Sequence, residues 1–227
     1  MPLPSPHAIL FDLDGTLADT APDLANAANK LRTARGLAPV AYESLRPVAS
    51  AGARGLIGAA FGIGPDSEDY PGLRDEFLRN YETAIAVDSV LFNGIAELLA
   101  HLEEEGIVWG IVTNKIEQLT SLLVPQIGLD HAGCVVSGDT AAFPKPHPAP
   151  LLEACKRIGI DPQQCWYVGD DLRDIQAGHA AGMTTIAAGW GYCGDVPPVK
   201  WEADAVAESP ADLLQLIHAA NRKTAKR

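Results

Sequence analysis

Short apolar runs alternate with stretches of helical periodicity along most of this chain. Apolar runs bounded by turn residues are typical of buried strands, and their alternation with helices indicates an α/β fold on a parallel sheet. We therefore expect a Rossmann-like parallel sheet with strands at residues 8–11, 108–112, 134–136, 165–168 and 184–188. The helical patterns between these runs fall at residues 117–126, 149–157 and 172–181, and a further helix before the second run carries Leu98, Leu99 and Leu102 on one face.

One long stretch interrupts this alternation. Residues 18–87 contain no convincing strand, and Gly and Pro cluster near residues 62–72. Helical patterns in this stretch fall at residues 23–35, 42–49, 53–61 and 73–86. An insertion of this length is large enough for a small domain of its own. We therefore expect an α/β core formed by residues 1–17 and 88–227, and an inserted helical domain at residues 18–87.

Charge and hydropathy exclude several classes of protein. The formal net charge of −12 argues against a general binder of nucleic acid or of anionic membranes, which would carry a basic face. No apolar run approaches the roughly 20 residues that a transmembrane helix needs. The N-terminus lacks the pattern of a signal peptide, and the four cysteines fit neither a zinc site nor a C-x-x-C motif. We therefore expect a cytoplasmic protein with reduced thiols.

Polar side chains follow four of the predicted strands or the loops after them. Ligands of parallel sheets bind at the carboxyl ends of the strands, so these side chains are expected to converge on one edge of the sheet. The residues concerned are Asp12, Asp14, Thr113, Asn114, Lys145, Asp170, Asp171 and Asp174.

The carboxylates in this group outnumber the cations. Asp12, Asp14, Asp170 and Asp174 are opposed mainly by Lys145, and carboxylates at close range cannot all stay ionised without compensation. A hard divalent cation resolves this, because Mg²⁺ prefers oxygen ligands and binds carboxylates together with substrate phosphate. The sequence therefore predicts a magnesium site.

These motifs resemble those of the haloacid dehalogenase superfamily, in their order and at fitting spacing. The matching segments are Asp12-Leu13-Asp14-Gly15-Thr16-Leu17, Thr113-Asn114, Lys145-Pro146, and Gly169-Asp170-Asp171 with Asp174. The resemblance implies that the helical insertion is a cap domain. Within the superfamily the chain looks most like phosphoglycolate phosphatases and their relatives, including N-acetylmuramic acid 6-phosphate phosphatases. The function implied is Mg²⁺-dependent hydrolysis of a small phosphate monoester through an aspartyl-phosphate.

The resemblance also implies a role for each matched residue. Asp12 would be the nucleophile, and Asp14 the general acid and then the base. Thr113 and Asn114 would bind the phosphoryl oxygens, and Lys145 would neutralise their charge. The metal would be held by Asp12, the backbone carbonyl of Asp14 and Asp170, with Asp174 orienting a metal-bound water or Lys145. For Asp171, a role at the metal and a role as a helix N-cap both remain open.

Substrate recognition is expected to involve the cap. Arg54, in the Gly-rich segment at residues 50–55, is a candidate for binding a substrate carboxylate, because its guanidinium suits bidentate contacts. Both phosphoglycolate and N-acetylmuramic acid 6-phosphate carry a carboxylate, so Arg54 does not separate them. Trp190 and Tyr192 follow the last predicted strand and either pack on a sugar or fill the core or cap interface.

Other functions remain open at this point. A sugar-phosphate mutase of the same fold would use Asp12 and Asp14 but return the phosphate to a sugar. A non-catalytic module that binds a phospho-ligand would need none of the four motifs intact. A dehalogenase is disfavoured, because it has little use for the acid at Asp14. The expected partner is a small phosphorylated metabolite that bears a carboxylate, and the expected state is a monomer or a dimer.

Overall fold

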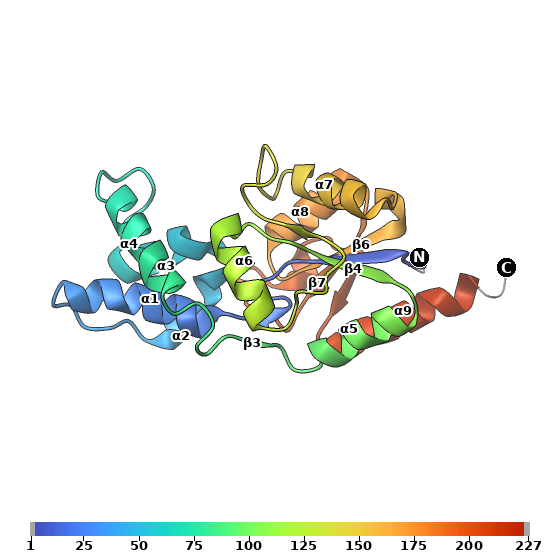
Figure 1. The fold of residues 1–227 in the computed structure, drawn as a ribbon, viewed down its shortest axis with the longest axis horizontal. Coiled ribbons are helices and arrows are strands. Elements are labelled where there is room, and N and C mark those ends of the chain that lie inside the picture. Colours follow the sequence, from blue (N-terminus) through green and yellow to red (C-terminus); the bar gives the residue numbers. More distant parts are fainter. Residues whose placement is uncertain (1–2, 225–227) are drawn as a thin grey trace.

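The computed structural model describes residues 3–224, and its core is a parallel sheet with the strand order β5-β4-β1-β6-β7-β8 (Figure 1). All five neighbouring pairs run parallel. This confirms the predicted α/β fold with a Rossmann-like sheet. The strands are β1 (Ala8–Phe11), β4 (Val108–Val112), β5 (Val135–Val136), β6 (Cys165–Gly169), β7 (Thr184–Ala188) and β8 (Ala205–Ala207).

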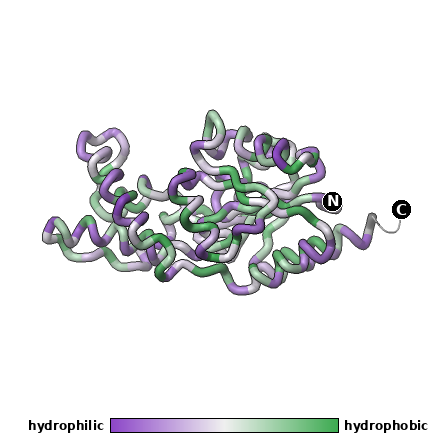
Figure 2. Tube along the Cα trace, viewed as in Figure 1, coloured by the Kyte–Doolittle hydropathy of each residue, from purple (hydrophilic) through white to green (hydrophobic). Residues whose placement is uncertain are grey.

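Helices cover both faces of this sheet. Successive side chains of a strand point to opposite faces. Ile9 and Phe11 of β1 accordingly pack in one apolar cluster, with α5 (Ile95–Glu104), α6 (Glu117–Gln126) and α9 (Pro210–Thr224). Leu10 packs in a second cluster on the other face, with α7 (Ala149–Ile158) and α8 (Leu172–Ala181). Figure 2 shows hydrophobic segments in the central strands and on the helices around them, as a sheet covered on both faces requires.

Two elements of the core were not predicted. The edge strand β8 has the sequence Ala-Val-Ala and pairs with β7, but a run this short has no clear periodicity. The helix α9 covers β8 and packs against α5. Two further short helices, η2 (Pro162–Gln164) and η3 (Pro198–Lys200), are 3₁₀ turns. No helix within residues 3–224 combines the length and apolar character needed to cross a bilayer.

The insertion between β1 and β4 is helical, as predicted, and lies beyond one edge of the sheet (Figure 1). Its helices pack on one another, with α1 in contact with both α3 and α4. They are α1 (Ala21–Ala34), α2 (Tyr42–Leu45), the 3₁₀ helix η1 (Arg46–Ala51), α3 (Gly52–Phe61) and α4 (Tyr70–Glu82).

The structure corrects two of the predicted helices in this insertion. The segment expected as one helix at residues 42–49 is split, because Pro47 has no N–H to bond to the carbonyl of Glu43. The helix α4 begins at Tyr70 rather than at residue 73, because Pro71 is tolerated in the first turn of a helix.

A short antiparallel ribbon joins the insertion to the core. It consists of β2 (Ala18–Asp19) and β3 (Val90–Leu91), so residues 18–19, expected to contain no strand, do form one. Beside it, the buried carboxylate of Asp23 accepts bonds from the backbone N–H groups of Asp88 and Ser89 and from the Ser89 hydroxyl. We propose that residues 18–87 form the cap, with this ribbon as its junction to the core.

Candidate active site

The site is built around Asp12, which follows β1 at the carboxyl edge of the sheet. Its backbone N–H donates to the carbonyl of Val168, which continues the pairing of β1 with β6. Its Oδ1 lies 2.7 Å from Nζ of Lys145. The same Nζ lies 2.8 Å from Asp174 Oδ1 and donates to the Tyr167 hydroxyl at 2.8 Å. The same Nζ also donates to the backbone carbonyl of Val112 at 2.9 Å. Four oxygens therefore surround the three N–H donors of the Lys145 ammonium, and the side chain is held in one place.

Asp170 completes a cluster of three buried carboxylates with Asp12 and Asp174. One oxygen from each of these side chains lies within 4.8 Å of the others. Among residues 3–224, Asp170 has neutral partners only, because it accepts bonds from the hydroxyls of Thr16 and Ser50 and from a backbone N–H.

Burial and mutual repulsion disfavour ionisation of Asp12 and Asp170. Burial raises the pKa of Asp170 to about 8, and the charges of Asp12 and Asp174 add to the effect. Burial also raises the pKa of Asp12 to about 7, although the Lys145 ammonium partly opposes it. A single lysine thus leaves the cluster short of positive charge. Three buried carboxylates with this deficit fit a hard divalent cation, so the donor set suits Mg²⁺.

Two glycines let the backbone approach Asp170 closely. Gly15 has φ +91°, and a Cβ there would lie 2.1 Å from Oδ2 of Asp170. A Cβ at Gly191 would lie 2.2 Å from Cβ of Asp170 and 2.4 Å from the Gly15 carbonyl oxygen. Only glycine fits at these two positions without displacing the carboxylate.

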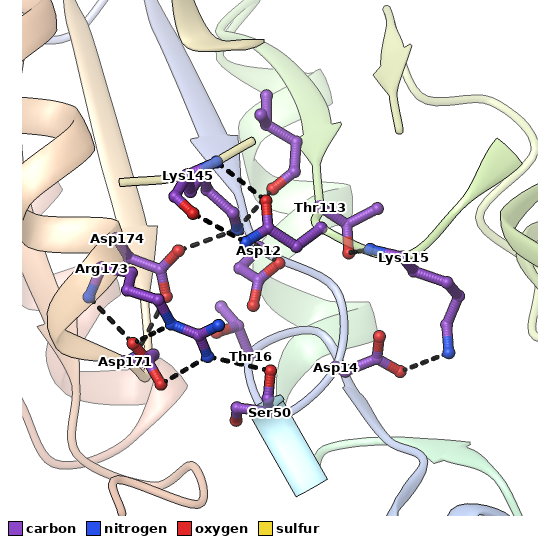
Figure 3. A network of polar contacts seen from close by, with 12 residues as sticks. Asp12, Asp14, Thr16, Ser50, Thr113, Lys115, Lys145, Asp171, Arg173 and Asp174 are labelled. Atoms are coloured by element: carbon purple, nitrogen blue, oxygen red, sulfur yellow. Dashed lines mark hydrogen bonds and ion pairs between the residues drawn. The ribbon is translucent and has the colours of Figure 1, made fainter. Parts of the chain in front are cut away.

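Asp14 lies across the site from Lys145 and is paired with Lys115, which Figure 3 shows reaching towards it. Nζ of Lys115 lies 3.1 Å from Asp14 Oδ1, and the Thr20 hydroxyl donates to the same oxygen at 2.5 Å. Lys115 also donates to the hydroxyl of Tyr81, a buried residue of α4. Burial by itself lowers the pKa of Lys115, but the charge of Asp14 and the contacts with Tyr81 outweigh it and raise that pKa.

Thr113 and Asn114 follow β4 and line the same cavity. The Thr113 hydroxyl accepts a bond from the backbone N–H of Lys115. The Asn114 side chain exchanges two bonds with the backbone of Lys145, donating to its carbonyl at 3.0 Å and accepting from its N–H at 2.9 Å. Asn114 therefore fixes the loop that presents Lys145, a contact that the sequence did not predict.

Asp171 acts as the N-cap of α8. Its side chain accepts from the backbone N–H of Arg173, and Asp174 accepts from the Asp171 N–H, which completes a capping box. The Arg173 guanidinium binds both carboxylate oxygens, at 2.7 and 2.8 Å. Burial opposes ionisation of Asp171, but these bonds to Arg173 outweigh it and lower the pKa. Asp171 is not one of the clustered carboxylates, which favours the N-cap interpretation.

The carboxylates and Lys145 open into a cavity of about 410 Å³ between the sheet edge and the inserted helices. Ala51, Gly52 and Ala53 border it, but Arg54 does not, and the Arg54 side chain is exposed. Each residue of a helix turns by about 100°, so Arg54 faces a different direction from Ala53. This placement does not support the predicted contact of Arg54 with substrate. Among the described residues, the cations that line the cavity are Arg74, Lys115 and Arg173, together with Lys145.

Trp190 and Tyr192 lie outside the cavity lining. The Trp190 indole donates to the Thr16 carbonyl at 2.9 Å. The Tyr192 hydroxyl accepts from the N–H groups of Thr20 and Ala21 at the start of α1, and the ring lies under the Arg46 guanidinium. Of the two interpretations, packing at the junction of core and cap is therefore the one that the structure favours.

Comparisons with known proteins agree with this geometry. A family model described as haloacid dehalogenase-like hydrolase matches residues 9–188. The chain is 48% identical over 210 residues to a phosphoglycolate phosphatase of Xanthomonas campestris pv. campestris (strain 8004), a match that covers 92% of this chain and 95% of that protein. It is 42% identical over 212 residues to an N-acetylmuramic acid 6-phosphate phosphatase of Pseudomonas aeruginosa, covering 92% and 94%.

A solved structure shows the same fold. The crystal structure of a predicted phosphoglycolate phosphatase from Haemophilus somnus 129pt superposes with a TM-score of 0.82 at 27% identity, covering 93% of this chain and 97% of that one. Motifs, fold and relatives thus agree over nearly the whole described chain. The chain belongs to the haloacid dehalogenase-like hydrolases and is a phosphatase of that family.

Proposed function

We propose that this phosphatase hydrolyses a small phosphate monoester with the help of Mg²⁺ and carries the phosphoryl group on Asp12. The observation that supports this is the contact of 2.7 Å between Lys145 and a buried Asp12 that faces the cavity. A carboxylate held beside a cation at a fixed position is a competent nucleophile towards phosphorus.

In the first step, a carboxylate oxygen of Asp12 attacks phosphorus and the bond from phosphorus to the leaving oxygen breaks. Asp14 donates a proton to that oxygen, which then departs as an alcohol. In the second step, Asp14 takes a proton from a water that attacks phosphorus. The bond to Asp12 breaks, phosphate is released, and the Asp12 carboxylate is restored.

Positioning supplies most of the remaining rate enhancement, as is usual in phosphoryl transfer. The Lys145 ammonium faces the phosphoryl group and the carboxylate that it joins. The Thr113 hydroxyl binds a phosphoryl oxygen, and Asn114 keeps the Lys145 loop in place through its two backbone contacts. These groups are fixed before substrate arrives, so little reorganisation is needed in the transition state.

Asp12, Asp170 and the backbone carbonyl of Asp14 would hold the Mg²⁺, with Asp174 beside them. When bound, the ion supplies positive charge that offsets the phosphate and the clustered carboxylates. The raised pKa values of Asp12 and Asp170 support this assignment, because carboxylates that resist ionisation by themselves favour a divalent cation.

Phosphoglycolate is the first candidate substrate, since a relative 48% identical to this chain carries that name. N-acetylmuramic acid 6-phosphate is the second, and the cavity favours it. A volume of about 410 Å³ leaves room beyond a two-carbon leaving group, and Leu24, Phe77 and Leu119 provide apolar walls. Both candidates carry a carboxylate, and Arg74 at the cavity is the exposed arginine that we propose to bind it.

The test is phosphate release from phosphoglycolate, N-acetylmuramic acid 6-phosphate and several sugar phosphates, each with and without Mg²⁺. A kcat/KM advantage of at least about a hundredfold for one compound, on the order of 3 kcal/mol, names the substrate. Release of phosphate from all compounds at similar rates, and only with Mg²⁺, would support the phosphatase chemistry but would leave the substrate open. Transfer of phosphate between positions of a sugar, without release, would favour a mutase, and the absence of either reaction would favour a binding module.

A further inference from the structure

We infer that Lys115 is a positioning residue for Asp14, and that Tyr81 of the cap holds Lys115 in the place where it does this. The inference rests on the proposed acid–base role of Asp14. It extends that role by naming the contact through which the cap reaches the proton-transferring carboxylate.

One oxygen of the Asp14 carboxylate, Oδ1, is held by two partners. Nζ of Lys115 and the hydroxyl of Thr20 both contact Oδ1, at 3.1 and 2.5 Å. Within residues 3–224 no hydrogen bond or ion pair engages Oδ2. Fixing one oxygen from two sides sets the rotation of the carboxylate and leaves the other free to exchange a proton with the leaving group. A general acid needs this alignment, because proton transfer requires hydrogen-bond geometry.

The position of the Lys115 ammonium depends on Tyr81 as well as on the Lys115 backbone. Lys115 follows Thr113 and Asn114, and its backbone is fixed by bonds to the Thr113 hydroxyl and to the N–H of Gly138. Its four-carbon side chain would still be free to rotate without a partner at the tip. That partner is Tyr81, whose hydroxyl lies 3.1 Å from Nζ and whose ring centroid lies 4.4 Å from it. A bond to the hydroxyl and a cation–π contact act on the same ammonium.

Lys115 and Tyr81 come from different parts of the molecule. Lys115 belongs to the core, whereas Tyr81 lies on α4 in the inserted domain and is fully buried. The side chain of Lys115 is only 6% exposed, so the contact is shielded from water. The Lys115 ammonium thus couples the position of α4 to the alignment of Asp14. Without α4 in place, Lys115 lacks one of its two oxygen partners.

The experiment compares two kinds of leaving group. An alkyl phosphate needs a proton on its leaving oxygen, whereas p-nitrophenyl phosphate departs without one. For p-nitrophenyl phosphate, the rapid first release of p-nitrophenolate measures phosphorylation of Asp12 alone. We expect Lys115→Met to lower kcat for the best alkyl phosphate by about 30-fold or more, within the range of general acid catalysis. The first release of p-nitrophenolate should change by less than about threefold, and a burst should precede a slower steady state.

Tyr81→Phe keeps the ring and removes only the hydroxyl, so we expect the same split between substrates with a loss of about three- to tenfold for the alkyl phosphate. If Tyr81 acts through Lys115, the double variant loses no more than Lys115→Met alone, because the two effects are then not additive. Lys115→Arg retains the charge and should recover part of the loss. The matched controls are Tyr70→Phe on the same helix and Lys156→Met on an exposed face, and neither should change either rate.

Several outcomes would overturn the inference. An equal loss in the burst and in alkyl turnover would mean that Lys115 binds the phosphoryl group or supports the fold. A rise in KM alone would make it a substrate-binding residue, and unchanged rates would remove any role. Asp14→Asn is the reference that separates this inference from the proposed function. If Asp14→Asn lowers alkyl phosphate turnover no more than the p-nitrophenolate burst, the acid–base role of Asp14 fails. If Asp14→Asn does lower alkyl turnover more than the burst and Lys115→Met does not, only the positioning role of Lys115 fails.

Discussion

Nζ of Lys145 lies 2.7 Å from Oδ1 of Asp12, although 133 positions separate the two residues in the sequence. Both side chains are nearly buried, at 3% and 10% exposure. Lys145 is also the one cation within reach of Asp174 in the described part of the chain. Removing it would leave two carboxylates in a buried site without a counter-charge.

We therefore expect Lys145→Met to lower both stability and activity. Removing one partner of a buried ion pair costs about 3 kcal/mol or more, and losing a donor to the reacting group costs about a hundredfold or more in kcat. Urea unfolding and steady-state kinetics measure the two effects. Lys156→Met, whose side chain is 82% exposed, serves as the control and should change neither. A Lys145 variant of full stability would show that the pair does not hold the cluster together.

Asp12→Asn should abolish turnover and leave the fold intact. An amide is a poor nucleophile towards phosphorus, so we expect kcat to fall by at least about 10⁴-fold. The substitution leaves Lys145 paired with Asp174 at 2.8 Å, so no buried charge loses its last partner and the melting temperature should not fall. Activity assays with thermal unfolding test both statements, with the exposed Asp130→Asn as control. Retained activity in Asp12→Asn would exclude an intermediate on that residue.

The stability of the metal-free protein should depend on pH in a way that Mg²⁺ reverses. In the folded protein, Asp12 and Asp170 have pKa values of about 7 and about 8, against an ordinary value of 3.8. Between these limits the folded state holds protons that the unfolded chain has lost. This contribution is therefore fully present below pH 3.8 and is lost as the pH rises through 7 to 8.

Thermal unfolding in EDTA should accordingly show a melting temperature that falls between pH 5 and pH 8, by on the order of 5 °C. Added Mg²⁺ should raise it, and more at pH 8 than at pH 5, because the ion binds the ionised carboxylates. Asp170→Asn should flatten the metal-free profile. A metal-free melting temperature that rises steadily over this range would contradict the assignment of a charge-deficient cluster.

The residues that the sequence located best are those at the ends of strands. Asp12 follows the four buried residues of β1, and Asp170 follows the five buried residues of β6, so a parallel sheet necessarily brings them to one edge. Their partners depend on contacts that no local pattern encodes. Tyr81 and Lys115 are 34 positions apart and meet only because α4 packs on the core. The direction of Arg54 depends on where α3 begins, and one residue changes it by about 100°.

Arg74 and Arg54 offer a direct test of substrate recognition. Both are exposed arginines of the inserted helices, but only Arg74 lines the cavity. We expect Arg74→Gln to raise KM for a carboxylate-bearing substrate by about tenfold, the effect of about 1.4 kcal/mol of lost binding. Arg54→Gln should leave KM unchanged. Steady-state kinetics on phosphoglycolate and on a phosphate ester without a carboxylate would separate the two, since Arg74→Gln should affect only the first. The reverse pattern would restore Arg54 as the recognition residue.

Tyr192 should contribute to stability through the start of the cap. Its hydroxyl lies 2.8 Å from the N–H of Thr20 and 2.9 Å from that of Ala21, two donors that have no partner within α1 itself. Tyr192→Phe preserves the ring and its contact with Arg46 but leaves these buried N–H groups unbonded. We expect a loss of about 2 kcal/mol in the free energy of unfolding.

The backbone N–H of Tyr192, which donates to Asp170, is unaffected by this change. The variant should therefore keep its response to Mg²⁺ while it unfolds at a lower urea concentration. Urea titrations of Tyr192→Phe and of the control Tyr70→Phe, each with and without Mg²⁺, measure this. Equal stability of the two variants would mean that the first turn of α1 finds other acceptors. A lost response to Mg²⁺ would instead mean that the hydroxyl also supports the carboxylate cluster, because the backbone contact alone would not maintain it.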